Sequence, residues 1–288
     1  MPEIIDQSET MESSIPSYEE KLQLIQELRE LVSNSTFTEA RTDDVFLLRF
    51  LYCCDWDVDA SYKRLLKVMQ HRRNHPTWFI NEDASNYIAL LKENIKTVLD
   101  KRDKNGRRIY LTKLGNIKSH IKASDLAQLD DLWFNTILDE PETIEKGISV
   151  VIDMKNASWR ILKLLSPGNV KVAAQSADIT PIKHMEFHIV NSSAILNSAV
   201  TLVFPFLGQR LKDQIHFHNS NMKSMHDHLG YDALPEEYGG EKGYKVEYES
   251  LYKRLVVDYG KGADYKVSTN NNNKEELKEN LNPEGNCR

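Results

Sequence analysis

The sequence predicts an α/β protein in which an N-terminal helical bundle is followed by a largely parallel sheet flanked by helices. Two observations lead to this fold class. Before residue 100, apolar residues recur at the three- and four-residue spacing of amphipathic helices. After residue 100, β-branched runs alternate with helical segments, which is typical of crossover units that join parallel strands.

The N-terminal bundle is expected over residues 17–99. Ser17 and Glu20 form a capping box for the first helix, and Asp57 can cap the third. Pro76 ends that third helix because proline cannot continue the hydrogen-bond pattern. Apolar spacing predicts four helices, over residues 17–32, 42–52, 57–75 and 87–98.

Residues 100–250 are expected to form the sheet domain. Asp103–Gly106 is a tight-turn sequence, and Pro167 suits the first turn of a helix. The expected strands cover residues 109–113, 147–154, 185–191 and 214–218. The expected helices begin near Ser124, Ser166 and Ala194.

Composition and charge narrow the class of protein. The 288 residues are 40% hydrophobic and 28% charged, as in typical globular chains. The formal net charge is −6, so the chain lacks the basic excess with which nucleic-acid binders replace phosphate counterions. No run approaches the roughly 20 apolar residues of a membrane-spanning helix. We therefore expect no nucleic-acid partner, and we expect a monomer.

The two ends and the cysteines point to the cytoplasm. Residues 1–16 are acidic and lack the apolar segment of a secretory signal, so we expect a disordered leader. Residues 251–288 are expected to be a C-terminal extension, disordered from about residue 264, where Asn, Lys and Glu predominate. An odd number of cysteines without a secretory signal predicts reduced thiols at Cys53, Cys54 and Cys287.

Several catalytic motifs are missing. The chain has only 12 glycines, and no glycine-rich phosphate loop follows any expected strand. The G-x-S-x-G turn of serine hydrolases is also absent. We therefore expect no cofactor and no enzymatic activity.

Two polar groups have more than one explanation. His216 and His218 share one face of a strand, with His226 and His228 close behind, so a metal site is conceivable. A polar sheet edge is the simpler explanation, because no Cys or Glu completes a metal-binding spacing; we expect no metal. Asp153 could be catalytic, but at the end of a buried strand we expect it to accept backbone N–H groups of the next loop.

The helical stretch over residues 194–207 is more apolar than a surface helix needs to be. Asn197, Ser198 and Thr201 form one narrow polar stripe, and the rest of its surface is apolar. An amphipathic helix needs an apolar face of only about 100°. Burial between sheet and bundle, a bound lipid, or a membrane would each explain the surplus. Pro205 and the polar stripe favour a helix that moves.

Several segments resemble one known family. LLRFLYCCDWDVDASYKRLLKVMQHRR resembles the helical N-terminal region of CRAL-TRIO lipid-binding proteins. The runs GISVVIDMKNAS, PIKHMEFHIVNSS, VFPFLGQRLKDQIHFH and LPEEYGG resemble the family's lipid-binding domain in order and spacing. The resemblance covers about residues 17–250. It is nearest to the branch of alpha-tocopherol transfer protein, cellular retinaldehyde-binding protein and many insect relatives.

The resemblance implies a hydrophobic cavity for one molecule, with the sheet as its floor and a mobile gate helix at residues 194–207. Strand alternation and helix faces then give the residues expected to contact the ligand. They are Trp133, Phe134, Ile137, Ile148, Val150, Ile152, Phe187, Ile189, Leu196, Val200, Val203, Phe204 and Leu207. Thr136, Gln175 and Ser176 could hydrogen-bond a ligand head group.

The resemblance also raises the question of a phosphoinositide site. Lys183 and Arg210 match basic residues of the cleft in alpha-tocopherol transfer protein. Met185 and Gln214 stand where that protein has basic side chains. Two cations, each contributing about 1 kcal/mol at an anionic surface, predict a weak site at most.

The sequence therefore predicts a non-enzymatic cytoplasmic protein that binds a small hydrophobic ligand. A retinoid, a tocopherol-like molecule or another isoprenoid lipid would suit it. The protein would carry that ligand between membranes, with transient peripheral contact to each. The alternative is a phosphoinositide-sensing adaptor that performs no net lipid transfer.

Overall fold

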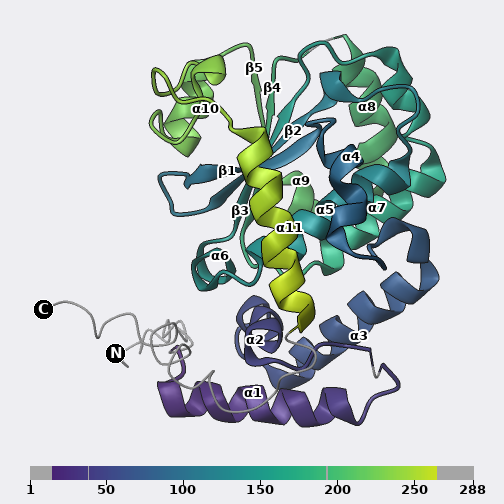
Figure 1. Cartoon of the computed structure of the whole chain (residues 1–288), viewed down its shortest axis with the longest axis vertical. Coiled ribbons are helices and arrows are strands. Elements are labelled where there is room, and N and C mark those ends of the chain that lie inside the picture. The colour runs from purple at the N-terminus through teal and green to yellow at the C-terminus, as the bar shows by residue number, and fades with distance from the viewer. Residues whose placement is uncertain (1–14, 38, 193, 265–288) are drawn as a thin grey trace, which may run out of the picture.

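A computed structural model describes residues 15–37, 39–192 and 194–264. The expected leader, residues 1–16, lies almost entirely outside the described residues, and the tail expected to be disordered from about residue 264 lies outside them too. Between these ends the helical bundle lies at one end of the molecule and the sheet at the other (Figure 1).

The bundle contains α1 (Tyr18–Ser33), α2 (Asp44–Cys53) and α3 (Val58–Asn74). The expected capping box at the start of α1 is present, with reciprocal bonds between Ser17 and Glu20. Asp43 and Asp57 cap α2 and α3 by accepting backbone N–H bonds. The three helices form a separate hydrophobic core, which includes Ile25, Leu47 and Leu65.

Within the described residues the strands form one five-stranded sheet in chain order. β1 pairs antiparallel with β2, and the remaining neighbours are parallel, as the alternating pattern predicted. The strands are β1 (Lys96–Arg102), β2 (Arg108–Lys113), β3 (Ile148–Asp153), β4 (Met185–Val190) and β5 (Ile215–Asn219).

Strand β1 corrects one prediction, since a fourth bundle helix was expected over residues 87–98. The chain instead forms a 3-10 turn (Ala84–Tyr87) and the short α4 (Ile88–Leu91), then turns at Asn94, where φ is +51°. Residues 96–98 pair with β2. The apolar spacing of this segment suits a helix, but pairing with a neighbouring strand overrides that local preference.

Helices cover both faces of the sheet (Figure 1). One face carries α10 (Met222–Leu229), which contacts β4 and β5. The other face carries α5 (Ala123–Ile137), α7 (Pro167–Ile179) and α8 (Ile195–Val203). The remaining short helices are α6 (Pro141–Lys146), α9 (Gln209–Lys212) and the 3-10 turns Pro76–Trp78, Leu114–Asn116, Trp159–Lys163, Phe204–Phe206 and Glu236–Tyr238.

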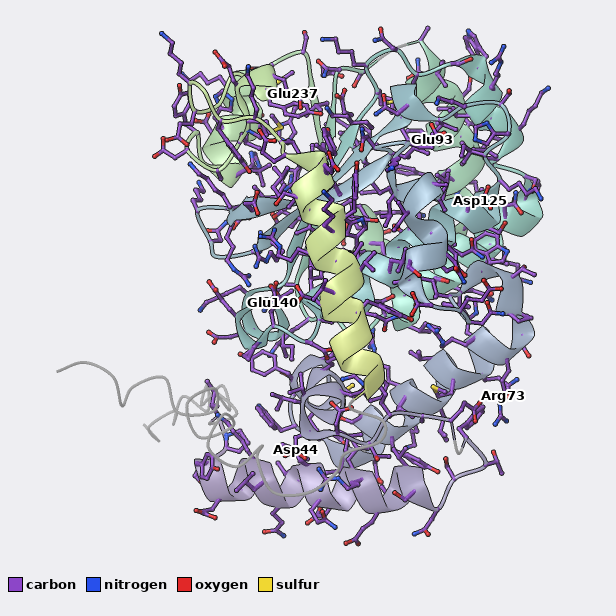
Figure 2. All side chains as sticks on the ribbon, viewed as in Figure 1. Asp44, Arg73, Glu93, Asp125, Glu140 and Glu237 are labelled. Carbon is purple, nitrogen blue, oxygen red and sulfur yellow. The ribbon has the colours of Figure 1, made fainter. Side chains whose placement is uncertain are left out.

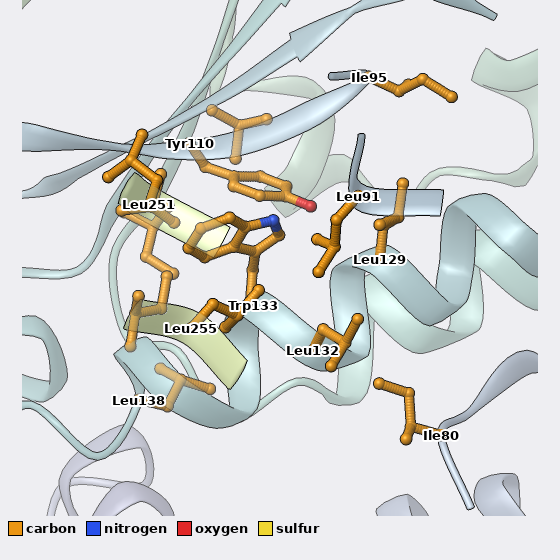
Figure 3. Close-up of a cluster of buried hydrophobic side chains, with 14 of the residues drawn as sticks. Ile80, Leu91, Ile95, Tyr110, Leu129, Leu132, Trp133, Leu138, Leu251 and Leu255 are labelled. Atoms are coloured by element: carbon orange, nitrogen blue, oxygen red, sulfur yellow. The ribbon is translucent and has the colours of Figure 1, made fainter. Parts of the chain in front are cut away.

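A further helix, α11 (Tyr248–Asp264), packs along α5 and β1, where no helix was predicted. Leu251 and Leu255 of α11 are 2% and 1% exposed and join Tyr110 and Trp133 in one apolar cluster (Figure 3). Trp133 also donates its indole N–H to the backbone oxygen of Lys96, at 3.2 Å. This helix therefore fastens the start of the C-terminal extension onto the sheet domain.

The outer surface carries charged side chains, several of which form ion pairs (Figure 2). Arg73 of the bundle pairs with Glu39, and Glu237 pairs with Lys113. Glu140 accepts hydrogen bonds from both Arg102 and Arg108. An exposed pair such as Arg73–Glu39 contributes about 0–1 kcal/mol, so the apolar cores carry most of the stability.

Candidate functional site

A cavity of about 670 Å³ lies between the sheet and helices α5, α7 and α8. Its size falls within the roughly 300–1,000 Å³ of pockets that enclose small molecules. Apolar side chains make up most of its wall. Those from the sheet, the helices and the connecting turns include Leu126, Phe134, Val150, Ile152, Met154, Ile161, Leu164, Val170, Phe187, Ile189, Leu196, Val200, Val203, Phe204, Leu207 and Ile215.

Strand alternation builds the floor of this cavity, because every second side chain of a strand faces the same side. Two neighbouring rows cross β2, β3 and β4 in register and line the cavity. The rows are Tyr110, Val150, Phe187 and then Thr112, Ile152, Ile189. The intervening residues face α10 on the other side of the sheet.

Helix α8 forms a wall of the cavity through Leu196, Val200 and Val203. Within α8, Ile195 is the only residue that is fully buried. The helix continues into the 3-10 turn at Phe204–Phe206, which contains Pro205. The apolar surplus of this segment therefore faces a hollow rather than a packed core.

Most of the residues predicted to contact ligand do line this cavity, and their contact with a ligand stays a prediction. The residues that line it are Phe134, Thr136, Val150, Ile152, Ser176, Phe187, Ile189, Leu196, Val200, Val203, Phe204 and Leu207. Four others lie elsewhere. Trp133, Ile137 and Ile148 pack into the apolar core, and Gln175 is exposed on α7.

Helix α5 explains two of these misplacements. Its strongest apolar stripe, with Leu129, Leu132 and Trp133, packs into the core beside α11. The neighbouring stripe, which includes Leu126, Ala127, Asp130 and Phe134, faces the cavity. The residues of this second, less apolar stripe are the ones that line the cavity. Helical periodicity alone selects the most apolar stripe, so it placed Trp133 and Ile137 in the cavity wall.

One side of the cavity wall is polar, and sequence reasoning missed it. The Lys96 Nζ lies 2.6 Å from both carboxylate oxygens of Asp130. Tyr110 donates its hydroxyl to the same carboxylate at 2.8 Å, and burial raises the pKa of Tyr110 well above its ordinary value. Thr112, two residues beyond Tyr110 on β2, also lines the cavity. Together these groups place hydrogen-bond donors and an acceptor at the β1–β2 side.

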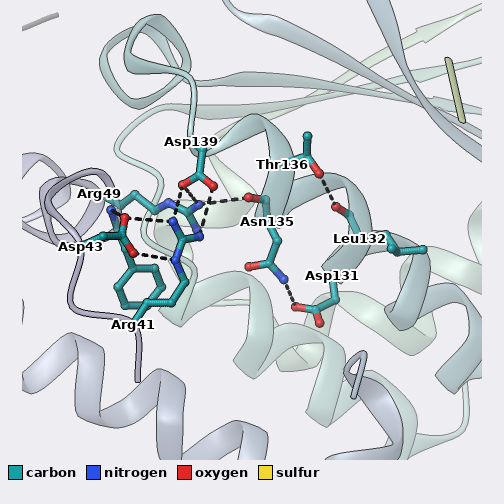
Figure 4. A network of polar contacts seen from close by, with 9 residues as sticks. Arg41, Asp43, Arg49, Asp131, Leu132, Asn135, Thr136 and Asp139 are labelled. Carbon is teal, nitrogen blue, oxygen red and sulfur yellow. Dashed lines mark hydrogen bonds and ion pairs between the residues drawn. The ribbon is translucent and has the colours of Figure 1, made fainter. Parts of the chain in front are cut away.

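A second polar group borders the cavity where the bundle meets α5 (Figure 4). Arg49, 2% exposed, pairs with Asp139 and donates to the backbone oxygen of Asn135 at 3.0 Å. Arg41 bridges Asp43 and Asp139. Burial lowers the pKa of Arg49, and the nearby Asp139 carboxylate opposes that shift. A lone arginine in the apolar run LLRFL was the sequence signal for this contact.

Asp153 has a structural role of the kind expected. It accepts the backbone N–H of Lys155, the side-chain amide of Asn191 and the hydroxyl of Tyr238, each at 2.8 Å. These bonds tie the ends of β3 and β4 to the loop after α10. In the described residues no group of three or more His, Cys, Asp or Glu side chains is arranged to hold a metal ion.

The two cations of the expected phosphoinositide site already face carboxylates. Lys183 lies 2.6 Å from Asp55, and Arg210 lies 3.9 Å from Asp178. Cys53 at the end of α2 and Cys54 just after it lie close by and are free thiols. This surface therefore carries less free positive charge than the sequence pattern implied.

The fold and the site together define an α/β protein with a helical N-terminal bundle and a mostly apolar cavity on one face of its sheet. The model of the CRAL/TRIO domain matches residues 92–240, and that of the CRAL/TRIO N-terminal domain matches residues 18–67. The chain belongs to the CRAL/TRIO family, as the sequence motifs predicted.

Several characterised proteins are similar. Clavesin-1 of Rattus norvegicus is 28% identical over 221 residues, which are 75% of this chain and 62% of clavesin-1. The alpha-tocopherol transfer protein-like protein of Mus musculus is 28% identical over 226 residues, which are 77% of this chain and 66% of that protein. Clavesin-2 of Homo sapiens is 25% identical over 267 residues, 90% of this chain and 81% of its own length. This chain therefore spans less than two thirds of clavesin-1.

The crystal structure of Sfh5 has a similar fold. The TM-score is 0.54 with 13% sequence identity, and the match covers 85% of this chain and 98% of Sfh5. At this identity the likeness extends to the fold alone. Among the described residues, no helix has both the length and the apolar character needed to cross a bilayer.

Proposed function

We propose that this chain binds one small hydrophobic molecule and transfers it between membranes without catalysing a reaction. A retinoid, a tocopherol-like molecule or another isoprenoid lipid is the expected ligand class. The observation that carries the proposal is the cavity of about 670 Å³ with a mostly apolar wall, one side of which is the gate helix α8. Similarity to an alpha-tocopherol transfer protein-like protein supports the same ligand class.

The cavity is large enough for burial to drive binding. Removing roughly 400 Å² of apolar ligand surface from water contributes about 10 kcal/mol at ~25 cal/mol per Å². Part of this is offset by the motion the ligand loses on binding. The Lys96–Asp130 pair and the Tyr110 hydroxyl would receive the polar end of the ligand and set its orientation.

Exit of the ligand requires the gate helix to move. Ahead of α8 the chain turns at Asn191, where φ is +51°, and behind it lie Pro205 and Gly208. Phe206 beside the gate is 39% exposed and Trp159 of the neighbouring turn is 58% exposed. Large apolar side chains on the outside of the gate are suited to insertion into a membrane surface, where opening would expose the ligand to lipid. The free thiols of Cys53 and Cys54 suit a cytoplasmic protein.

The first experiment identifies the ligand. Protein purified from cells is extracted with organic solvent, and the extract is analysed by mass spectrometry beside an extract of an unrelated protein purified in the same way. We expect one enriched hydrophobic species at close to one molecule per chain. An extract without any enriched species, together with no saturable uptake of retinol, tocopherol or another isoprenoid probe, would refute the proposal.

A vesicle assay separates the carrier from the phosphoinositide-sensing adaptor. The double variant Lys183→Gln/Arg210→Gln removes both cations of the expected phosphoinositide site. A carrier should still move a labelled tocopherol between phosphatidylcholine vesicles at the rate of the parent chain. If transfer does not occur, and vesicle binding depends on phosphoinositide and on these two residues, the adaptor function is the correct one.

A further inference from the structure

Four histidine rings lie together on the face of the sheet opposite the cavity. They come from β4, β5 and α10, and we call His188, His216, His218 and His228 the histidine cluster. The ring centroids of His188 and His216 are 5.2 Å apart, and those of His216 and His228 are 4.8 Å apart. The largest separation, between His216 and His218, is 6.5 Å. Each ring therefore lies within contact range of the other three.

Two of these rings are buried and share a hydrogen bond. His188 is 0% exposed and His218 is 2% exposed, whereas the other two are half-buried. The His188 Nδ1 lies 3.0 Å from the His218 Nε2, so one of these nitrogens must be an unprotonated acceptor. The other nitrogen of His218 lies 2.9 Å from the Ser224 hydroxyl. The Nε2 of His188 is buried without a hydrogen-bond partner.

The surroundings offer little compensation for added positive charge. From β4, Glu186 has its carboxylate 3.7 Å from the Nε2 of His188, but Arg107 already pairs with it at 2.6 Å. On β3, the residue in register with His188 is the apolar Val151. From α10, Ser224 accepts a bond from His228 through its backbone oxygen. A cluster that holds more than one proton would place like charges about 5 Å apart in a partly dry site.

The cluster is linked to the gate by the strands that carry it. His188 alternates with the cavity-lining Phe187 and Ile189 along β4. β4 leads into the gate helix, and β5 follows the segment that ends it. The backbone N–H of Asn191 donates to the oxygen of Asn219 at 2.6 Å, which joins the two strand ends beside the gate. Loosening of β4 against β5 would therefore free both ends of the gate segment.

We propose that the histidine cluster makes ligand release sensitive to acid, because protonation of its buried rings separates β4, β5 and α10 and allows the gate helix to open. The inference rests on the proposed carrier function and assigns to it a form of regulation. It predicts firm retention at neutral pH and release where the surroundings of a membrane are acidic.

The sign of the effect follows from the protonation states. Burial, with smaller contributions from the neighbouring rings, lowers the pKa of His188 from 6.5 to about 3, and burial likewise lowers that of His218 to about 4. Both rings are therefore neutral in the closed state and take up protons once exposed. The closed state keeps its full stability above pH 6.5 and loses it as the pH falls from 6.5 toward the closed-state pKa values of about 4 for His218 and about 3 for His188. At pH 5.0, exposure of His188 alone favours opening by about 30-fold (10 to the power 6.5 − 5.0).

The test measures release of a nitrobenzoxadiazole-labelled tocopherol into excess phosphatidylcholine vesicles at pH 7.5 and 5.0, with a chelator in both buffers. We expect release from the parent chain to be at least about 30-fold faster at pH 5.0, because exposure of His188 alone gives this factor and exposure of His218 adds to it. Replacing both buried rings, as His188→Leu/His218→Leu, should reduce this ratio to below about threefold, because the two groups that take up protons on opening are gone. The two rings are replaced together because each is the other's hydrogen-bond partner, and only the Ser224 hydroxyl loses a bond. His120→Gln is the matched control, since the side chain of His120 is 64% exposed and lies outside the cluster.

A second variant covers the case in which the double replacement does not fold. His228→Gln removes a half-buried ring of the cluster and keeps a polar side chain. Its acid response should be smaller than that of the parent chain. Circular dichroism at pH 5.0 should show an intact fold, so that release reflects local opening.

The possible failures are distinguishable. A probe that is not retained at pH 7.5 would refute the carrier function, and the inference with it. A probe that is retained at pH 7.5 but leaves at equal rates at both pH values would refute the histidine inference alone. The histidine inference would also be overturned if His188→Leu/His218→Leu released the probe with the same acid response as the parent chain. If that variant is unfolded, an unchanged response in His228→Gln would have the same meaning. Global unfolding of the parent chain at pH 5.0 would overturn the inference too.

Discussion

The substitution Phe204→Asp distinguishes a cavity wall from a packed core. Phe204 lines the cavity at the end of α8, and its ring centroid lies 6.4 Å from that of Phe217. It is half-buried and belongs to none of the buried clusters of the described residues. We expect this change to weaken ligand binding far more than it weakens the fold.

The magnitudes follow from what each environment loses. A phenylalanine covered by ligand contributes about 2–3 kcal/mol of apolar burial, so its loss should raise the Kd by about 30- to 150-fold. The fold loses only partial burial near a helix end, about 1 kcal/mol, which lowers the Tm by about 2–4 °C in a chain of this size.

Two variants of the same segment serve as controls. Ile195 is 3% exposed and packs with Met154, Ile161 and Ile189, so Ile195→Asp should cost more than about 4 kcal/mol of stability. Phe206 is 39% exposed on the turn that follows α8, the proposed gate helix. Phe206→Asp should therefore keep ligand affinity and slow transfer to vesicles.

The assay combines fluorescence titration of retinol or labelled tocopherol with thermal unfolding followed by circular dichroism. The reasoning requires Phe204→Asp to lose affinity while its Tm stays close to that of the parent chain. The contrary result is that Phe204→Asp loses as much stability as Ile195→Asp and that its affinity falls only in proportion to the fraction of unfolded chains. Phe204 would then belong to a packed core, and its assignment to the cavity wall would be wrong.

Three other substitutions test the polar contacts. Asp130→Asn should weaken binding of a hydroxylated isoprenoid by about tenfold, because Asp130 is the acceptor on the polar side of the cavity. Binding of an isoprenoid hydrocarbon should be unchanged. Equal losses of affinity for both ligands, measured by titration, would contradict this role. Tyr238→Phe removes the hydroxyl that donates to the buried Asp153 and should lower the free energy of unfolding, measured in urea, by about 1–3 kcal/mol. An unchanged urea midpoint would show that this hydrogen bond contributes nothing to stability. Ser17→Ala removes the capping box of α1 and should cost about 1 kcal/mol by the same method, whereas the exposed Ser85→Ala should cost less.

Local patterns predicted the elements whose own residues carry the signal. The capping box at Ser17, the three bundle helices and the parallel strands follow from capping residues, helical spacing and β-branched runs. Strand β1 did not follow, because Ile95 just before it and Val98 within it continue a helical spacing from Tyr87 and Leu91. The pairing of residues 96–98 with β2 decides between the two structures.

The cavity could be inferred only in part, for a related reason. The surplus of apolar surface on residues 194–207 indicated a second apolar surface, and the family motifs gave its place above the sheet. The polar side was hidden because Lys96, Tyr110 and Asp130 meet only after β1, β2 and α5 have assembled. A single sequence does not contain the register that brings them together.

The positions of the histidine rings also depend on strand register. His226, which looked like part of a metal-binding pattern, bonds instead with the backbone oxygen of Tyr238, while His188 completes the cluster from a different strand. Because side chains alternate along β4, the strand presents His188 to α10 and presents Phe187 and Ile189 to the cavity. Along β4, the side toward α10 is thus densely packed, and the side that presents Phe187 and Ile189 borders a hollow. A displacement of β4 driven from the packed face meets little resistance on the hollow one, so the cavity and the gate helix are where such a displacement should have its largest effect.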